Sequence, residues 1–273
     1  MDPFTTTGNP SIGFQAISFL MPLLSTDAVV LHAFDYSESS RILRLATRDA
    51  GAQSVLARGA RRSSTKFGSA LGLFAQGVAH LHLKSGRDLQ TMSSFDCTHA
   101  RTAIGCDLER FTGAAALAEL MLRFSTDERN EDLYMTLIDA LDAIEVAPPN
   151  RARGTSLAGA WRLVAELGFA PALDICGTCE TPFSAGQPLR FVPEAGGVLC
   201  VRCARDFASG RPIPASACST IAAWLQAVDV PVLDPREARA HQRLLREFVH
   251  SHLADGRALR AFDVWENGEW NAR

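Results

Sequence analysis

The sequence predicts an α+β multidomain protein, in which an N-terminal five-stranded OB-type β-barrel precedes an α-helical bundle with an inserted four-cysteine zinc loop. Three observations lead to this fold class. Strand-like alternation runs to about residue 96, helical periodicity begins near residue 99, and two CxxC pairs lie within 176–203. The chain has 273 residues, of which 47% are hydrophobic, enough for two or three small cores.

The domain boundaries follow the changes in pattern along the chain. Residues 1–20 are polar and rich in turn formers, and we expect a disordered leader or a tag. Their apolar stretch, Ile17–Met21, is too short to span a bilayer. The expected segments after this leader are 21–97 for the nucleic-acid-binding barrel, 98–175 for the helical bundle, 176–203 for the zinc loop and 204–273 for the continued bundle.

Five short strands are expected in the barrel. They cover residues 28–34, 41–48, 53–58, 76–84 and 89–95. Asp49–Gly51 is a hairpin signal between the second and third strands. In the fourth strand, Ala79, Leu81 and Leu83 share the apolar face. Five strands with one long connection between the third and the fourth are typical of a small OB-type barrel.

The barrel segment is strongly basic, although the whole chain carries a formal net charge of −3. Residues 41–87 contain nine basic residues and one acid, Asp49, so this window carries +8 and the rest of the chain −11. The alternative is a solvated charged face, but a charge of this size on one small module favours a polyanion such as nucleic acid. Candidate stacking residues are few (Tyr36, Phe67 and Phe74), which favours binding to the backbone.

Helical periodicity covers most of the remaining chain. Phe111, Ala115, Ala118 and Leu122 form one apolar stripe, and Pro148–Pro149 ends the helix that follows it. Later, Pro235 begins a longer helix whose expected buried residues are Leu244, Leu245, Phe248, Val249 and Leu253. Arg239, Arg243 and Arg246 of that helix are interpreted either as an extension of a phosphate track or as a solvated face. A short helix from Gly256 to about Trp265 is expected to end the fold.

Four cysteines have the spacing of a structural zinc site. Cys176 and Cys179 form the first CxxC pair, and Cys200 and Cys203 form the second. The intervening loop contains turn residues and two short strand-like runs, Arg190–Val192 and Gly197–Leu199, as in a zinc ribbon. We expect one structural Zn²⁺ ion, because four thiolate ligands leave no open position for a catalytic water.

Other interpretations of these motifs are weaker. A redox dithiol would leave one CxxC pair unexplained, and an iron–sulfur cluster usually has different spacing. A disulfide framework is improbable in a long chain without a sign of secretion. The sequence has no Walker or dinucleotide loop, no GxSxG and no HExxH motif. A non-enzymatic protein is therefore expected.

Several stretches resemble the bacterial recombination mediator family RecO. The strongest match is Asp35–Gly51, followed by Ala57–Arg62. Phe67–Leu71, Cys176–Cys179 and Leu199–Cys203 also fit in this order. The resemblance runs from about Met21 to the end of the chain, and some members of the family lack the cysteines, which is consistent with a structural role for zinc.

The resemblance implies a DNA-binding mediator of repair and recombination. Such proteins bind single- and double-stranded DNA and anneal complementary strands. They act with RecR to load RecA onto DNA coated by single-strand-binding protein (SSB), whose C-terminal tail they also contact. The expected DNA-contacting residues are Arg41, Arg58, Arg61, Arg62, Lys66, Lys84 and Arg87. Asp35 and Glu38 are candidate structural partners for Arg41.

The expected location is the cytoplasm, in association with the nucleoid, without a membrane or a small-molecule substrate. Two other functions remain open from the sequence. A zinc-stabilised RNA- or ribosome-associated binding protein would use the same barrel and basic surface. A nuclease with scattered carboxylates would show metal-dependent cleavage that disappears on changing one Asp or Glu.

Overall fold

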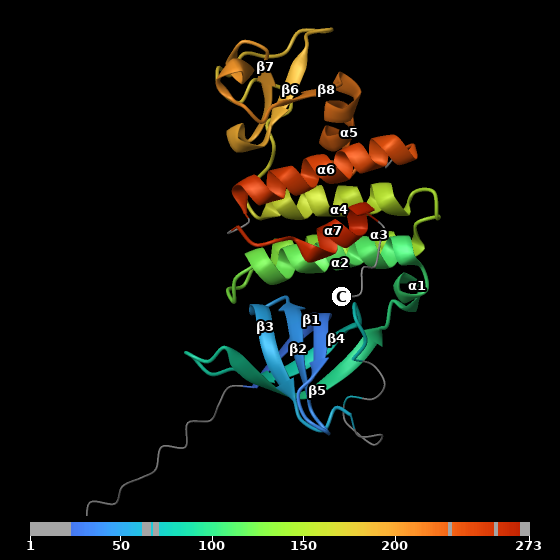
Figure 1. The fold of residues 1–273 in the computed structure, drawn as a ribbon. Coiled ribbons are helices and arrows are strands. Elements are labelled where there is room, and N and C mark those ends of the chain that lie inside the picture. Colours follow the sequence, from blue (N-terminus) through green and yellow to red (C-terminus); the bar gives the residue numbers. More distant parts are fainter. Residues whose placement is uncertain (1–22, 62–66, 68–70, 229–230, 254–255, 268–273) are drawn as a thin grey trace, which may run out of the picture.

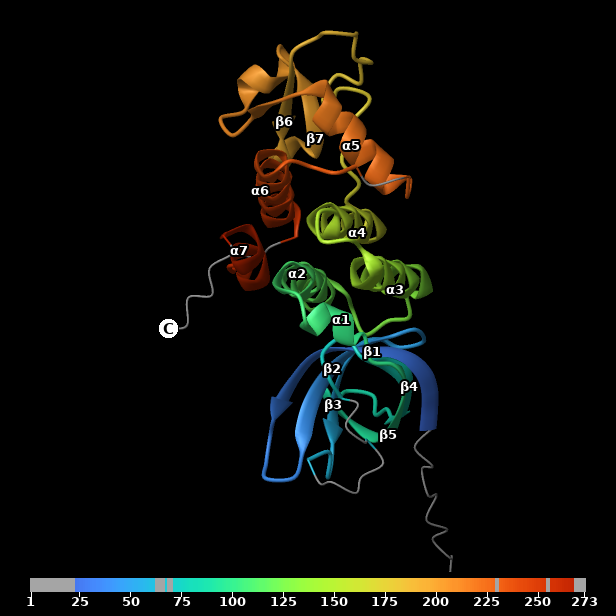
Figure 2. The same ribbon diagram turned by 90° about the vertical axis from the view of Figure 1, so that its right-hand side faces the viewer.

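The computed structural model describes residues 23–61, 67, 71–228, 231–253 and 256–267. A β-barrel lies at one end of the molecule, layers of helices occupy the middle, and a small sheet with its helix lies at the other end (Figure 1). The view at 90° shows the same sequence of layers (Figure 2). The predicted residues 1–20, Arg62 and Lys66 lie outside the described residues.

The five strands of the N-terminal part form a closed barrel in the order β1-β2-β3-β5-β4. The strands are β1 Leu23–Asp35, β2 Arg41–Thr47, β3 Gly51–Ala57, β4 Gln76–His82 and β5 Leu89–His99. The β3–β5 pair is parallel and the other neighbouring pairs are antiparallel. The five strands predicted from the sequence are therefore confirmed, with β1 and β5 longer than expected.

Side chains at alternate positions of the strands fill the interior of the barrel. Leu43 and Leu45 of β2 and Ala79 and Leu81 of β4 are buried there, as the alternation predicts. Phe67, from the long connection between β3 and β4, also packs into this core. Since neighbouring side chains of a strand point to opposite faces, Ile42 and His80 lie on the outside of the barrel.

Strand β1 contains one residue too many for its ladder with β2. Val30 pairs with Leu45 and His32 pairs with Arg44, so Leu31 has no partner in the register. A β-bulge of this kind exchanges the faces of all residues beyond it. Ala33 consequently packs against the barrel core, whereas Phe34 is 44% exposed on the outside.

The helices share one large core. They are α1 Thr102–Gly105, α2 Leu108–Phe124, α3 Glu131–Val146, α4 Ala152–Glu166, α5 Ala215–Leu225, α6 Pro235–His252 and α7 Arg260–Asn267. Asp107 and Asn130 cap α2 and α3, and Asp234 forms a capping box with Glu237 at the start of α6. In the centre of the core, the rings of Trp161, Phe191 and Phe248 contact one another.

The helix prediction was incomplete for α2 and wrong in one boundary. In the stripe predicted for α2, Ala118 is buried, and its other three members are partly buried and pack against the core, which also contains Ala114, Leu117 and Met121. The reason is that the barrel, α4 and α7 cover α2 from several sides, so burial does not follow a single stripe. The last helix begins at Arg260 and not at Gly256.

The four predicted cysteines belong to a unit that is built on a three-stranded sheet in the order β7-β6-β8, which we call the cysteine unit. Its strands are β6 Leu189–Val192, β7 Gly197–Cys200 and β8 Arg211–Ile213. Two 3-10 turns, Pro193–Ala195 and Cys203–Asp206, follow β6 and β7. The two strands predicted in the cysteine loop are confirmed, and the third comes from beyond the predicted loop because β8 pairs with β6.

Candidate metal centre and nucleic-acid interface

The fold brings the four predicted cysteines together. The sulfur atoms of Cys176, Cys179, Cys200 and Cys203 all lie within 4.8 Å of one another. Tetrahedral Zn²⁺ with Zn–S bonds of about 2.3 Å places its sulfur ligands roughly 4 Å apart. All seven cysteines of the chain are free of disulfides. The cluster is therefore compatible with one tetrahedral zinc ion, which these four thiols would hold.

Backbone hydrogen bonds shape the first CxxC turn. The N–H of Glu180 donates to the carbonyl of Cys176 at 2.8 Å, and the N–H of Cys176 donates to the carbonyl of Thr181 at 3.0 Å. Gly177 donates to the carbonyl of Val198 on β7 at 3.0 Å, which joins this turn to the strand that leads to the second pair. The N–H of Cys200 points at the sulfur of Cys176, 3.5 Å away. Local turns and one strand pairing thus assemble the centre.

The thiols of the cluster differ in acidity. The Thr181 hydroxyl, 3.3 Å from the sulfur, lowers the pKa of Cys179 to about 6. The Cys200 side chain, together with desolvation, raises the pKa of Cys203 to about 12. Four neighbouring thiolates repel one another, and a bound dication would remove that repulsion and keep all four deprotonated. The donor set therefore suits Zn²⁺.

A second group of possible metal ligands lies where the barrel meets the helices. His99 Nε2 is 2.7 Å from Glu145 and His99 Nδ1 is 3.7 Å from Asp142. The two carboxylates face opposite nitrogens of one imidazole ring. This cluster, which the sequence analysis missed, joins β5 to α3, and one ligand atom from each residue lies within 4.8 Å of the other two.

The predicted nucleic-acid residues divide into two groups. Arg41 and Arg61 share the carboxylate of Asp35, at 3.0 and 3.5 Å. Arg61 also donates to the carbonyl of Ser37 at 3.2 Å, and the adjacent Arg58 is exposed. These three arginines therefore gather at the end of the β1–β2 hairpin. Of the two expected partners of Arg41, the structure gives Asp35, its cross-strand neighbour, and not Glu38.

Lys84 and Arg87 form the second group, in the turn between β4 and β5. The side chain of Gln90 accepts from the N–H of Lys84 at 2.7 Å and donates to the carbonyls of Lys84 and Arg87 at 3.0 and 2.8 Å. Both basic side chains are exposed. In the parallel β3–β5 ladder Ser54 pairs with Leu89 and Ala57 with Met92, so this turn and Arg58 lie toward opposite ends of the ladder.

Two arginines of the basic window join the barrel to the helices. Arg44 donates to the carbonyl of Leu122 at 3.0 Å. Arg48 forms ion pairs with Glu131 and with Asp27, the latter at 3.6 Å. The hydrogen bond that Arg48 donates to the Glu131 carboxylate is the main cause that raises the pKa of Arg48. The +8 charge of the sequence window therefore overstates the charge available to a polyanion, since these partners lie outside the window.

The arginines of α6 are also partly occupied. Arg243 lies 3.4 Å from Glu266, and Arg246 lies 3.0 Å from Glu266 and 3.3 Å from Asp263. These contacts attach α7 to α6. Of the three α6 residues considered in the sequence, Arg239 is exposed without such a pairing among the described residues.

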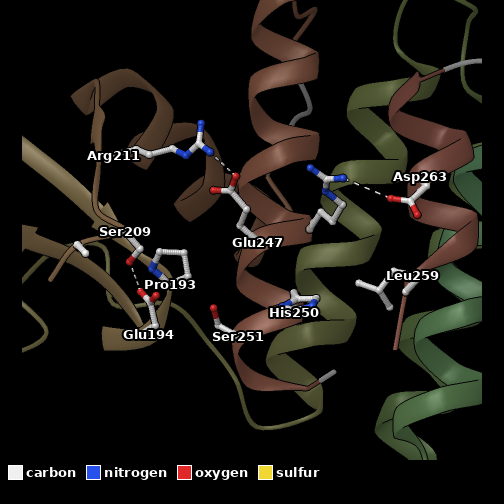
Figure 3. A pocket seen from close by; sticks show the side chains of 12 residues that line it. Pro193, Glu194, Ser209, Arg211, Glu247, His250, Ser251, Leu259 and Asp263 are labelled. Carbon is white, nitrogen blue, oxygen red and sulfur yellow. Dashed lines mark hydrogen bonds and ion pairs between the residues drawn. The ribbon is translucent and has the colours of Figure 1, made fainter. Parts of the chain in front are cut away.

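A cavity of about 680 Å³ separates the cysteine unit from α6 and α7 (Figure 3). Charged residues line it, but they pair with each other: Arg211 with Glu247 at 2.6 Å and Arg246 with Asp263 at 3.3 Å. Ser209 and Glu194 hydrogen-bond on the sheet side. None of the four cysteines and none of the seven expected DNA-contacting residues is among the residues that line this cavity, whereas Arg246 of α6 is.

The barrel, the helical layers and the four-cysteine unit define a class of protein, in which a small basic β-barrel is joined to a helical domain that carries a four-cysteine cluster. The model described as "Recombination protein O N terminal" matches residues 21–101, and "Recombination protein O C terminal" matches residues 106–260. The chain belongs to the RecO family.

Curated relatives support this assignment over most of the chain. The "DNA repair protein RecO" of Anaeromyxobacter sp. (strain K) is 34% identical over 252 residues, which covers 89% of this chain and 96% of that protein. The protein of the same name from Anaeromyxobacter dehalogenans (strain 2CP-1 / ATCC BAA-258) is 35% identical, and the match covers 86% of this chain and 93% of that protein. The protein of the same name from Rubrobacter xylanophilus is 29% identical, and the match covers 85% of this chain and 92% of that protein.

Within the described part of the chain, none of the helices combines the length and the apolar character required to cross a membrane.

Proposed function

We propose that this chain is a DNA-binding recombination mediator that acts in DNA repair. It binds single- and double-stranded DNA and anneals complementary strands. With RecR it helps to load RecA onto single-stranded DNA coated by SSB, whose C-terminal tail it contacts. It performs these steps in the cytoplasm, at the nucleoid, as a non-enzymatic protein without a small-molecule substrate, and the four-cysteine centre holds one structural zinc ion.

The observation that carries this proposal is the closed barrel with exposed cations at the end of the β1–β2 hairpin and in the β4–β5 turn, in a chain that belongs to the RecO family. Arg58 and Arg61 lie at one end, and Lys84 and Arg87 lie in the turn held by Gln90. Cations that contact phosphates release counterions from DNA, which makes the affinity strongly dependent on salt. A cationic surface also reduces the repulsion between two backbones while complementary bases pair. Both effects suit an annealing protein.

A salt titration of binding to single-stranded DNA tests the proposal. The comparison is the triple variant Arg58→Ala, Arg61→Ala, Arg62→Ala. If these side chains contact phosphates, the slope of log affinity against log salt falls by about 2 in the triple variant, at about 0.7 per lost contact. A matched control removes the same charge from α6: Arg236→Ala, Arg239→Ala, Arg243→Ala. This control is expected to retain the wild-type slope.

Each alternative has its own outcome. A slope that falls only in the α6 control moves the DNA site to that helix. Equal competition by RNA and DNA of the same length favours the RNA- or ribosome-associated alternative. The absence of binding to any nucleic acid rejects the mediator function.

A further inference from the structure

The outer face of the barrel carries an exposed aromatic side chain that the simple alternation of β1 would bury. Ala28 and Val30 point into the barrel. Phe34 is an even number of residues from both, so simple alternation would point it into the barrel as well. The bulge at Leu31 reverses that parity and directs Phe34 outward, where 44% of it is exposed. The ring of His32 lies beside it, with centroids 5.7 Å apart. Bulges that redirect a side chain are frequent next to functional sites.

The neighbouring strands extend this feature into a small platform. Phe34 is opposite Ile42 of β2, which is in turn opposite Leu56 of β3. Directly opposed side chains in a sheet are about 5 Å apart, so the three form one continuous apolar row. Ile42 and Leu56 are only partly buried. We call Phe34, His32, Ile42 and Leu56 the outer platform.

Cations adjoin one end of the outer platform. Arg41 directly precedes Ile42 in β2, and Asp35, next to Phe34, forms ion pairs with both Arg41 and Arg61. Tyr36, also in this hairpin end, is 63% exposed. An exposed π-face beside guanidinium groups suits a nucleotide, whose base stacks while its phosphate meets the cations. A double helix keeps its bases stacked inside and cannot offer one to Phe34.

We infer that the outer platform is a base-stacking site for single-stranded nucleic acid, with Phe34 as the stacking residue and the Arg41–Arg61 end as the neighbouring phosphate contact. This inference rests on the proposed function and adds a binding mode to it. Backbone contacts alone, which the sequence favours, do not distinguish a strand with bases from one without them. Stacking does, because its free energy comes from the base.

The test compares two single-stranded oligonucleotides of equal length and charge, one of thymidines and one of abasic sites, by fluorescence anisotropy with the full chain. The wild-type protein is expected to bind the thymidine strand about fivefold to one hundredfold more tightly, as for one stacked base. Phe34→Ala should bring this ratio close to one and leave the salt slope unchanged. Leu23→Ala, which truncates another exposed apolar residue of β1, is the matched control and should keep the wild-type ratio.

A second variant separates stacking from folding. Phe34→Leu keeps apolar volume next to Ile42 but has no π-face, so it should also lose the preference for bases, with a thermal unfolding temperature close to that of the wild type. An unchanged ratio in Phe34→Leu overturns the inference. A ratio of one in the wild-type protein, with tight salt-dependent binding to both strands, also overturns it but leaves the proposed function intact. Failure of the wild-type protein to bind either strand rejects both.

A protein partner on the outer platform would give a different result. If Phe34→Ala weakens self-association of the chain and the base preference stays at the wild-type value, the platform is a protein interface and the inference is wrong.

Discussion

The guanidinium group of Arg101 donates two hydrogen bonds to a single carboxylate oxygen of Asp142, at 2.9 and 2.6 Å. The Arg101 side chain is fully buried, whereas that of Asp142 is 48% exposed. Arg101 also donates to the carbonyl of Phe74 at 3.0 Å and to Gln76 at 2.5 Å. Since Phe74 and Gln76 belong to the barrel side and Asp142 to α3, this one side chain joins the two parts of the molecule.

The first prediction concerns this junction. Asp142→Asn preserves the shape of the side chain but leaves the buried guanidinium without its charged partner. We expect a loss of about 1–3 kcal/mol in the free energy of unfolding, less than for a fully buried pair because Asp142 is half exposed. Chemical denaturation measures this loss. The control is Asp139→Asn on the same helix, whose exposed pair with Arg162 spans 3.7 Å and should contribute less than about 0.5 kcal/mol. Equal effects of the two variants would contradict the prediction.

The second prediction concerns the metal centre. We expect one zinc ion per chain in the wild-type protein and loss of that ion in Cys176→Ser and in Cys200→Ser, measured by elemental analysis. Structural zinc contributes roughly 10–16 kcal/mol of binding free energy in zinc-finger peptides, and part of this should appear as a lower unfolding temperature. Cys106→Ser, an exposed thiol outside the cluster, is the control and should retain the metal. Unchanged zinc in Cys176→Ser would remove Cys176 from the ligand set.

The third prediction concerns the pH dependence of stability. Burial lowers the pKa of His241 to about 4, whereas an unfolded histidine titrates near 6.5. Between these pH values the unfolded chain binds more protons, so stability is complete above about pH 6.5 and falls as the pH decreases toward 4, by up to roughly 3 kcal/mol. His241→Phe keeps a ring beside Trp224, which lies 4.9 Å away, and should weaken this dependence.

Denaturant unfolding at several pH values gives the relevant comparison. Because acid also protonates zinc-binding thiolates, the measured quantity is the difference between His241→Phe and the wild type at each pH. His250→Phe, at an exposed position of the same helix, is the control and should follow the wild-type curve. Parallel curves for His241→Phe and the wild type would show that His241 does not cause the acid loss.

The fourth prediction concerns the contact between α3 and α4. A Cβ atom at Gly159 would lie 2.7 Å from the Cβ of Ala140, inside van der Waals contact. Helix propensity favours Ala over Gly by about 1 kcal/mol, but overpacking of a core costs about 1–3 kcal/mol. We therefore expect Gly159→Ala to be neutral to destabilising in thermal unfolding. Gly105→Ala is the comparison, because nothing lies within 4 Å of the added Cβ. A stabilised Gly159→Ala variant would mean that the helices separate at little cost.

Much of the architecture could be predicted because its signals are local. Alternation in β2 and β4 identified the inner residues Leu43 and Ala79, and Asp49–Gly51 indicated the hairpin between β2 and β3. The start of α6 at Pro235 was also predicted from the sequence. By contrast, the stripe predicted for α2 is only part of its buried surface, because the barrel, α4 and α7 all pack against that helix.

The sequence by itself determined which four cysteines form a cluster and how many strands form the barrel. Each CxxC pair is local, so a single fold-back brings Cys176 near Cys200. Only the tertiary structure decided which basic side chains remain available to a polyanion, since Arg48 pairs with Glu131, 83 residues away in the chain. It also decided that Phe34 faces outward, because the bulge at Leu31 appears only when β1 pairs with β2. Residues that act together at short spacings can be recognised in the sequence. The direction and pairing of a side chain depend on which residues the rest of the fold places beside it.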